Sequence, residues 1–477
     1  MVDRKNSQRD VSETSEHSWL RDFCLMLFVM ERATTPTVVL VLDEVGTPTI
    51  NNTVSYTGFL TKEDNVRLIL ISSLGALTAE DKANALDFVE LKTPTTNGLL
   101  EVHALRLHAK HGIHKIYTKQ EDLILRAALL RDLLGITSGL SHQDALPFRD
   151  KELMKRCTSE KGFPVPPFSR IFSPASLLAF LQKHPLPVII KPSLGSASAG
   201  IRVVKTQEEL EHYLEHEYYA RIDDAGRCLD YSGDILAEAF VEGQMFHVNG
   251  FARDGVLTEV WPFLYINTNL GFTEGRAYGN VLVPPSDPRH ARLLDATRRL
   301  LAALPKVDDL VFHLELFDVG GEFHLCEIAA RRPGGSIGTL ISAAEGGALT
   351  ASDTSRSQNL FPEFEFRTSL GLEHRRSHHP ESPKRRHPNY TIGDLLIPRQ
   401  LGMLTQIPAA SACTLPNTQY FPFAKVGSVY EGFSMSTMNT AARFVVQMDN
   451  GTVEGMDSTL AAAAAWFESE VQYDAPA

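Results

Sequence analysis

The first third of the chain alternates apolar runs with amphipathic stretches. Residues 37–43 (TVVLVLD) and 66–74 (VRLILISSL) are almost continuously apolar, which is typical of strands buried on both faces of a parallel sheet. Residues 122–134 instead repeat their apolar positions with the period of a helix. Strands that alternate with helices in this way predict an α/β layer with a mostly parallel sheet.

The pattern changes near residue 148. A helix is predicted to begin there and to run to about residue 161, where GFPVPP (162–167) stops it. Residues 188–204 then predict a strand, a loop of small residues and a second strand, and residues 235–240 predict a further strand. Residues 247–260 predict a hairpin that turns at RDG (253–255). The C-terminal part combines short strands with an alanine-rich helix at residues 459–469.

Two glutamates occupy a second predicted hairpin, made of VFHLELF (311–317) and FHLCEIAAR (323–331). If the connecting loop is odd-numbered and centred on Gly321, Glu315 lies opposite Glu327 with their Cβ atoms about 4.5–5.5 Å apart. Two unneutralised carboxylates would repel each other there, so the arrangement indicates a shared divalent cation such as Mg²⁺. A solvated strand pair with two surface acids is the alternative interpretation. A two-residue turn would shift the register by one and remove the pairing.

A loop of small residues, SLGSASAG (193–200), separates the two strands of 188–204 and follows Lys191. Small side chains let backbone N–H groups approach phosphate oxygens, and the lysine supplies a positive charge. The loop is not a P-loop, because GxxxxGK[ST] is absent and a strand rather than a helix follows. Alone, it is also compatible with a plain turn.

Composition and charge narrow the possible functions. The chain has 477 residues, 43% of them hydrophobic and 22% charged, which is typical of a globular protein with two or three domains. Its formal net charge of −12 argues against a general binder of nucleic acids or anionic membranes, since both favour basic surfaces. A nucleotide pocket built from a few local cations remains compatible with it.

The cysteines and the N-terminal residues indicate the compartment. The five cysteines are scattered over the chain and form no zinc motif, so a reducing cytoplasm is expected. No run approaches the roughly 20 apolar residues that span a bilayer. Residues 23–30 (FCLMLFVM) come closest to a signal-peptide core, but charged residues flank them, so a buried helix is expected there. The first ~18 residues are polar and are expected to be disordered.

The order of these features resembles that of the ATP-grasp superfamily. Along the chain come an Asp-Lys pair at 150–151, Lys191 with its loop, AEAFVEG (237–243), and the two glutamates; the resemblance covers residues 150–340. It implies an α/β fold with α+β lids. The implied parts are an N-terminal parallel-sheet pre-ATP-grasp domain (37–147), a small lid (148–236), a large domain with the Mg²⁺ site (237–373) and a C-terminal subdomain (389–477). Residues 1–36 would be a disordered or helical extension, and residues 374–388 a basic loop.

The resemblance also implies which residues hold ATP. In the family, two lysines contact the phosphates, and a Gly-Ser-x-Gly segment folds over them. A hinge acid accepts a hydrogen bond from the adenine amino group, and the backbone after it pairs with the ring edge. The ATP-binding residues implied in this chain are Lys151, Lys191, Ser198, Gly200, Glu238, Phe240 and Val241.

The resemblance assigns the metal to the two glutamates. Glu315 and Glu327 match the family's Mg²⁺ ligands, for one or two ions, with Mn²⁺ as an alternative metal. Ala329 stands where many members have an asparagine ligand, so a second ion is expected to be held more weakly. Arg331 matches the arginine that stabilises the transferred phosphoryl group; on the residues alone, it could simply neutralise the glutamates.

The implied reaction joins a carboxylate to an amine. ATP phosphorylates the carboxylate, and the amine attacks the acyl phosphate, giving an amide, ADP and phosphate. Residues 326–341 (CEIAARRPGGSIGTLI) and 393–408 (GDLLIPRQLGMLTQIP) are most similar to the L-amino-acid ligase (dipeptide synthetase) branch. Asn280 stands where related ligases often have histidine. The residues expected to contact the small-molecule carboxylate and amine are Arg276, Asn280, Gly334 and Gly335. On the residues alone, Arg276 could instead be a surface charge and the glycines a plain turn.

Two alternative functions stay open. A ligase that delivers its acyl group to a carrier-protein thiol would use the same residues. The basic stretch at 374–388 (HRRSHHPESPKRRHP) would favour an acidic carrier, although a solvated loop explains it equally. A regulatory protein that binds ATP without turnover is the other alternative, and the complete set of Glu315, Glu327 and Arg331 weighs against it. No nucleic-acid or membrane partner is expected, and a homodimer is left open.

Overall fold

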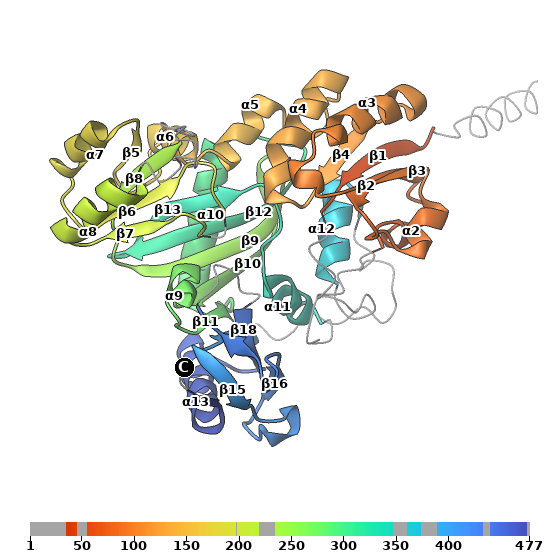
Figure 1. The fold of residues 1–477 in the computed structure, drawn as a ribbon. Helices are drawn as coiled ribbons and strands as arrows, with labels where there is room; N and C mark the ends of the chain where they lie inside the picture. Colours follow the sequence, from red (N-terminus) through yellow and green to blue (C-terminus); the bar gives the residue numbers. More distant parts are fainter. Residues whose placement is uncertain are drawn as a thin grey trace, which may run out of the picture.

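The computed structural model describes residues 35–44, 55–196, 198–218, 234–346, 360–373, 389–432 and 439–474. Figure 1 shows an N-terminal α/β layer, a small lid and a large central sheet that continues into the C-terminal part. The expected N-terminal disorder, the helix expected at residues 23–30 and the basic stretch at 374–388 lie outside the described residues.

The N-terminal layer is a four-stranded sheet of order β3-β2-β1-β4 in which each neighbouring pair is parallel. The parallel sheet predicted from the two apolar runs is therefore confirmed. Both faces of the sheet are buried, since Leu40 packs into one apolar cluster and Val39 into another. The strands are β1 (Thr37–Leu42), β2 (Val66–Ser73), β3 (Asp87–Leu91) and β4 (Lys115–Thr118).

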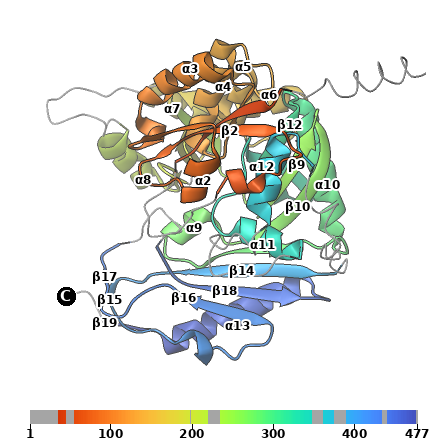
Figure 2. The same cartoon turned by 90° about the vertical axis from the view of Figure 1, so that its right-hand side faces the viewer.

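Different parts of the chain cover the two faces of this sheet. Helices α3 (Leu99–His111) and α4 (Ile124–Leu134) pack on one face. The other face receives Phe366 of α12 (Phe361–Ser369), a helix that comes far later in the sequence. Figures 1 and 2 both place α12 against this sheet. Two short helices complete the layer: α2 (Ala79–Asn84) and α5 (His142–Ala145).

The small lid is a four-stranded antiparallel sheet of order β5-β8-β6-β7. It contains the predicted strand–loop–strand of residues 188–204 and the strand predicted at 235–240. Helix α6 (Lys151–Glu160) precedes it, and the Asp150 side chain caps this helix by accepting from the Glu152 and Leu153 N–H groups. The other elements are β5 (Phe168–Ile171), α7 (Pro174–Leu181), β6 (Val188–Pro192), β7 (Arg202–Val204), α8 (Gln207–His212) and β8 (Ile235–Ala239).

The central sheet has eight antiparallel strands in the order β13-β12-β9-β10-β11-β14-β18-β16. The C-terminal subdomain was expected to begin at residue 389. Its first strand, β14, pairs with β11, so the central sheet includes strands from both sides of that boundary. The strands are β9 (Gln244–Arg253), β10 (Val256–Ile266), β11 (Tyr278–Leu282), β12 (Asp309–Val319), β13 (Glu322–Ala329), β14 (Thr391–Pro398), β16 (Thr418–Pro422) and β18 (Thr440–Met448).

Helices lie on both sides of the central sheet, and Figure 2 shows α13 beneath the C-terminal strands and α11 above them. The alanine-rich helix is confirmed as α13, which starts earlier than predicted because the Thr452 side chain caps it. The remaining elements are α9 (Asn269–Thr273), α10 (Pro288–Ala303), α11 (Ile337–Ala344), α13 (Val453–Glu470), and a small sheet of β17 (Val429–Tyr430), β15 (Gly402–Gln406) and β19 (Gln472–Asp474).

The β12–β13 hairpin pairs Glu315 with Glu327, as predicted, but not by the predicted turn. The connection has two residues, Gly320 and Gly321, both with positive φ (60° and 94°), which is the conformation that favours glycine in tight hairpins. A one-residue bulge at Cys326 follows, because Leu316 pairs with Leu325 while Glu315 pairs with Glu327. The odd-length turn was therefore wrong, and the bulge restores the pairing that a two-residue turn would have removed.

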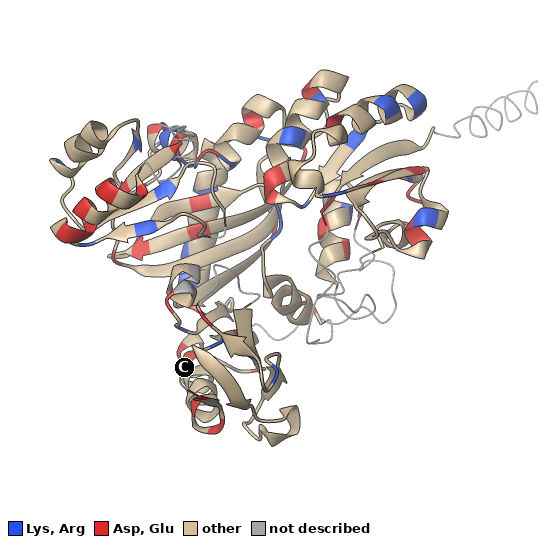
Figure 3. Ribbon diagram, viewed as in Figure 1, with Lys and Arg blue, Asp and Glu red and all other residues tan. Residues whose placement is uncertain are grey.

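Charged residues of both signs are spread over the described elements in Figure 3. Glutamates also occur on strands of the central sheet, and Lys191 and Glu238 lie on strands of the small lid, where they are buried. Among the described helices, none is long and apolar enough to cross a membrane.

Candidate active site

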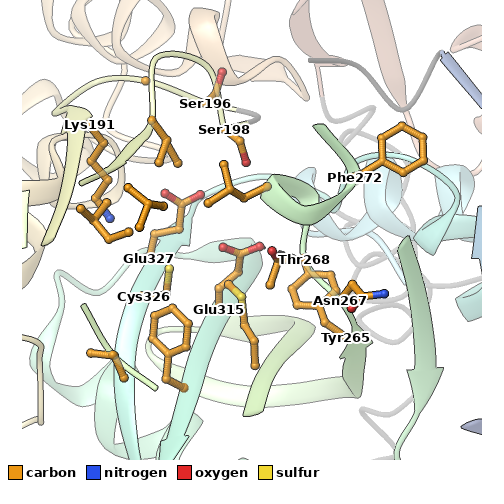
Figure 4. Close-up of a pocket in the computed structure, with 18 of the residues that line it drawn as sticks. Lys191, Ser196, Ser198, Tyr265, Asn267, Thr268, Phe272, Glu315, Cys326 and Glu327 are labelled. Carbon is orange, nitrogen blue, oxygen red and sulfur yellow. Dashed lines mark hydrogen bonds between the residues drawn. The ribbon is translucent and has the colours of Figure 1, made fainter. Parts of the chain in front are cut away.

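A cavity of about 780 Å³ lies between the small lid and the central sheet. Its size is that of an ordinary ligand pocket. Figure 4 shows Glu315 and Glu327 side by side in it, facing the loop of Ser196 and Ser198, with Lys191 nearby. The predicted site residues that line the cavity are Lys151, Lys191, Ser198, Glu238, Phe240, Val241, Arg276, Glu315, Glu327, Arg331, Gly334 and Gly335. Gly200 and Asn280 do not line it.

Lys151, the first residue of α6, connects this helix to the glutamate hairpin β12–β13. Its Nζ lies 2.9 Å from an Oε of Glu327 and donates to the carbonyl of Gly195 at 2.6 Å. Burial would raise the pKa of Glu327, but the positive charges of Lys151 and Lys191 outweigh it and lower that pKa to about 2. Glu327 is therefore ionised at neutral pH.

Glu238 lies between two buried lysines. Its carboxylate is 2.9 Å from Nζ of Lys191 and 3.2 Å from Nζ of Lys155. Burial opposes ionisation of Glu238, but the two lysines lower its pKa below the ordinary value. Burial also opposes the charge of Lys191, yet attraction to Glu238 raises the pKa of that lysine. Burial and the charge of Lys191 lower the pKa of Lys155, although Glu238 opposes this. Glu238 and Lys191 are therefore charged and compensate each other, which is what a buried charge requires.

Lys155 was not found by sequence reasoning, although it follows Lys151 by four residues and so shares its helix face. Its fully buried Nζ donates to the carbonyls of Leu325 and Cys326 at 2.9 Å each. These carbonyls flank the bulge that pairs Glu315 with Glu327. Lys155 therefore stabilises the local distortion on which the glutamate pair depends.

The glutamate pair fits a hard cation. The hydroxyl of Tyr265 donates to Oε1 of Glu315 at 2.7 Å, and Nε2 of His313 lies 3.5 Å from the same oxygen. In the described ranges, no group of three or more His, Cys, Asp or Glu side chains is placed to hold a metal ion. Two carboxylates completed by phosphate and water oxygens suit Mg²⁺, which commonly binds in that way.

The loop of small residues closes over the cavity from the small lid. Ser198 adopts a positive φ of 60° and lines the cavity. Gly200 also has a positive φ, 74°, and a Cβ there would approach Cγ of Pro192 to 2.9 Å. The structure thus explains the glycine by the path of the backbone. A direct contact between Gly200 and the phosphates is not supported, since the residue does not line the cavity.

The hinge after β8 forms another wall of the cavity. Phe240 and Val241 line it, and the backbone N–H of Phe240 donates to the carbonyl of Pro187 at 3.2 Å. The N–H of Phe240 is therefore already used. A ligand ring bound at this hinge would pair with the backbone carbonyls of the hinge or with the N–H of Val241. The carboxylate of Glu238 is directed to Lys155 and Lys191.

The far end of the cavity carries the residues expected to contact the substrates. Arg276 is largely exposed and pairs with Glu274 at 2.6 Å. Gly334 and Gly335 line the cavity, and nothing lies within 4 Å of where a Cβ would stand on either. The next residue, Ser336, donates from its hydroxyl to Asp394 of β14. The C-terminal strands thus hold the glycine loop in place.

Asn280 requires a correction. It is fully buried behind the cavity, where its amide donates to Asp394 at 2.8 Å and its oxygen lies 3.0 Å from Nε2 of His247. The hydroxyl of Tyr278 donates to the same oxygen at 3.2 Å. With its polar atoms bonded inside the protein, Asn280 supports the cavity wall and does not contact a substrate. The sequence alone does not reveal this, because His247 and Asp394 come from other strands, β9 and β14.

Arg331 lies at the boundary of the N-terminal layer and the cavity. Its Nε donates to the carboxylate of Glu121, and its Nη1 donates to the carbonyl of Arg332 at 2.7 Å. Its charge also favours ionisation of Glu327. Glu121 lines the cavity too, but it belongs to no motif that the sequence analysis recognised.

The fold, the cavity and its charged pairs define a class of protein. Residues 184–340 match the family model described as an ATP-grasp domain, and the chain therefore contains such a domain and has the ATP-grasp fold. The resemblance inferred from the order of the motifs is confirmed.

Particular relatives are ligases by name. The chain is 28% identical over 229 residues to the L-arginine-specific L-amino acid ligase of Bacillus subtilis, covering 47% of this chain and 53% of that protein. It is 27% identical over 240 residues to the D-alanine–D-alanine ligase of Geobacter sulfurreducens, covering 48% of this chain and 66% of that one. The matches thus span less than two thirds of either relative.

Solved structures share the fold over almost the whole chain. The crystal structure of an L-amino acid ligase from Bacillus licheniformis matches with a TM-score of 0.62 at 16% identity, over 93% of this chain and 100% of that one. A phosphoribosylglycinamide synthetase from Anaerococcus prevotii matches with a TM-score of 0.55 at 13% identity, over 92% and 100%. At these identities the likeness concerns the fold.

Proposed function

We propose that this protein is an ATP-dependent carboxylate–amine ligase. It would activate an amino acid or related carboxylate as an acyl phosphate and couple it to an amine, releasing ADP and phosphate. The observation that carries the proposal is the convergence in one cavity of Lys151, Lys191, Glu315, Glu327 and Arg331. The names of the relatives support a reaction that joins a carboxylate to an amine.

The ATP end of the cavity lies between the hinge and the small-residue loop. Lys151 and Lys191 would orient the phosphates, and the backbone around Ser198 would cover them. The adenine would lie against Phe240 and pair with the backbone near Val241. The carboxylate of Glu238 keeps Lys191 protonated, so Lys191 would present a positive charge to the phosphates.

Glu315 and Glu327 would hold one Mg²⁺, or two, with Mn²⁺ as a substitute, and the ion would neutralise phosphate charge during transfer. Ala329 offers no ligand oxygen from its side chain, so a second ion would depend on other oxygens. Lys151 already compensates part of the negative charge of Glu327 at 2.9 Å. Glu327 can therefore stay ionised before any cation binds.

Arg331 would act on the transferred phosphoryl group and then on the oxyanion formed as the amine attacks. Gly334 and Gly335 would present backbone N–H groups beside the acyl carbon, and Arg276 at the rim would bind a substrate carboxylate. Water must be kept out, because it would hydrolyse the acyl phosphate. The loop at 193–200 is placed to do this.

The proposal is tested by measuring ADP release over pairs of amino acids and amines with ATP and Mg²⁺. We expect ADP only when a carboxylate and an amine are both present, together with an amide of the summed mass less water. Glu327→Ala should lower the rate about a hundredfold or more, because a metal ligand is lost. Glu322→Ala, on the exposed start of the same strand, should not.

Two other results would replace the proposal. ATP binding without turnover for any pair would indicate a regulatory protein. ADP release that requires an added acyl-carrier protein would indicate loading of a thiol. Light scattering at several protein concentrations would show separately whether a homodimer forms.

We also infer that the partners are small molecules and that the protein works in the cytoplasm. The described cysteines Cys157, Cys326 and Cys413 are free thiols, which supports a reducing compartment. The domain bounds given above stay part of this proposal.

A further inference from the structure

Glu121 binds two arginines that belong to different parts of the site. It begins the short 3₁₀ turn Glu121–Leu123 at the carboxyl end of β4, in the N-terminal layer. One of its carboxylate oxygens accepts from Nη1 of Arg149, and the other accepts from Nε of Arg331. The three side chains are little exposed, at 14%, 7% and 16%. Both oxygens of one shielded carboxylate are thus bonded to guanidinium groups.

Arg149 connects Glu121 to the loop of small residues. Its Nη2 donates to the carbonyl of Leu194 at 3.0 Å, and Lys151, two residues later, donates to the carbonyl of Gly195 at 2.6 Å. Two successive carbonyls of the loop are therefore bonded to cations from the start of α6. Because Glu121 holds Arg149, the position of the loop depends on a residue of the N-terminal layer.

Arg331 connects Glu121 to the metal end of the cavity. Two of the three nitrogens of its guanidinium have protein acceptors, Glu121 and the carbonyl of Arg332. These bonds fix the plane of the group in the cavity that Glu327 also lines. An arginine side chain has several rotatable bonds and loses much of its freedom when held in this way. The orientation of Arg331 therefore depends on Glu121.

We propose that Glu121 is a positioning residue that couples the loop to Arg331. This inference rests on the proposed function. Arg149 holds the loop through the carbonyl of Leu194, and it shares the carboxylate of Glu121 with Arg331. Glu121 therefore positions the loop and orients the guanidinium group of Arg331 at the same time. Loss of the carboxylate charge should remove the link between the two guanidinium groups. Arg149 would keep the more distant Asp122, at 3.6 Å, and Arg331 the carbonyl of Arg332, so the two groups would no longer be held together.

Two effects should follow from that loss. Misplacement of Arg331 slows phosphoryl transfer, and a looser loop admits water to the acyl phosphate. In that side reaction the water oxygen bonds to the acyl carbon as the bond to the phosphate oxygen breaks, giving back the carboxylate and free phosphate. ATP is then consumed without an amide, so the ratio of ADP to amide rises.

The test compares Glu121→Gln, Glu121→Asp and Glu101→Gln in the full-length protein. Glu101 serves as the control because both oxygens of its carboxylate accept from an arginine, Arg126, at 2.6 and 2.7 Å. Unlike Glu121, it does not line the cavity. We expect Glu121→Gln to lower kcat about tenfold to a hundredfold, to change KM for ATP much less, and to raise the ratio of ADP to amide at least about twofold. Glu121→Asp should restore part of both, and Glu101→Gln should match the wild type.

A second measurement is independent of turnover. Hydrogen exchange of loop residues 194–201, with a non-hydrolysable ATP analogue bound, should be faster in Glu121→Gln than in the wild type and in Glu101→Gln. Wild-type protein that releases no ADP with any substrate pair would refute the proposed function, while the exchange data would still decide the role of Glu121. Unchanged loop exchange in Glu121→Gln would overturn the positioning role, as would an unchanged kcat and ADP-to-amide ratio in active protein.

Discussion

At the scale of single residues, Glu327 ties the site to pH. Its pKa is lowered from 4.5 to about 2: burial works against this, and Lys151 and Lys191 outweigh burial. A carboxylate with a depressed pKa in the folded state adds stability at pH values above its ordinary pKa. That contribution is lost as the pH falls from about 4.5 toward about 2.

The Glu327→Gln variant tests this dependence. We expect it to reduce the free energy of unfolding more at pH 6 than at pH 3. At pH 3 the unfolded wild type has already bound the proton, so much of the stabilisation by the ionised carboxylate is lost. Urea unfolding at a series of pH values measures the difference. Glu322→Gln, whose side chain is 63% exposed, serves as the control, and a difference for Glu327→Gln that is constant with pH would contradict the assignment.

Glu238 makes a second prediction at this scale. Replacing it by alanine leaves Lys155 and Lys191 buried without their shared partner, and the loss of one member of a buried ion pair costs about 3–5 kcal/mol. By contrast, Lys82→Ala breaks a pair with Glu90 in which the lysine is 38% exposed, and should cost at most about 1 kcal/mol. Chemical denaturation of both variants measures this contrast, and similar losses in the two would disprove it.

At the scale of elements, the β12–β13 hairpin shows what a sequence pattern predicts and what it leaves out. Alternating residues and a Gly-Gly connector predicted the hairpin and the pairing of Glu315 with Glu327 correctly. The turn length was wrong, because the residue pattern does not reveal a bulge at Cys326. The bulge depends on Lys155, which reaches it from another element.

The same reason explains the other gaps in the prediction from sequence. Residues that belong to a local sequence motif, such as Lys191 before its loop, were predicted correctly to lie at the cavity. Glu121 was missed and Asn280 was misplaced, because their bonds join strands and helices far apart in the chain. Tertiary contacts of this kind leave no periodicity or spacing in a single sequence.

Lys155→Met tests the link between α6 and the bulge. The variant keeps the apolar stem and leaves Glu238 paired with Lys191, but removes the donors to the carbonyls of Leu325 and Cys326. Unmade bonds to buried carbonyls should cost about 1–3 kcal/mol, less than the loss expected for Glu238→Ala. Hydrogen exchange should accelerate in residues 325–328. If exchange there does not change, the lysine does not stabilise the bulge.

At the scale of the whole molecule, the C-terminal strands are part of the central sheet. β14 pairs with β11 and β18, and Arg443 of β18 donates to Asp394 of β14 at 3.0 Å and to Thr339 of α11 at 2.8 Å. A chain that ends at residue 388 would expose β11, whose residues are all buried, as an unpaired edge strand, which promotes aggregation.

Truncation tests this continuity. We expect a chain ending at residue 388 to be insoluble or to lack a cooperative thermal transition, whereas a chain ending at residue 474 should behave like the wild type. Size-exclusion chromatography and calorimetry distinguish the two. A soluble, cooperatively folding chain that ends at residue 388 would show that the strands after that residue form a separable unit.

The contact of α12 with the N-terminal sheet has a consequence for synthesis. Phe366 packs on Val39 and Val41, Glu365 accepts from the hydroxyl of Tyr117 at 2.7 Å, and Arg367 pairs with Asp64 at 2.7 Å. The helix begins about 240 residues after β4 ends, so the ribosome needs on the order of tens of seconds to reach it. During that interval this face of the first sheet lacks the part of its apolar cover that α12 supplies, and a chaperone would have the opportunity to bind there.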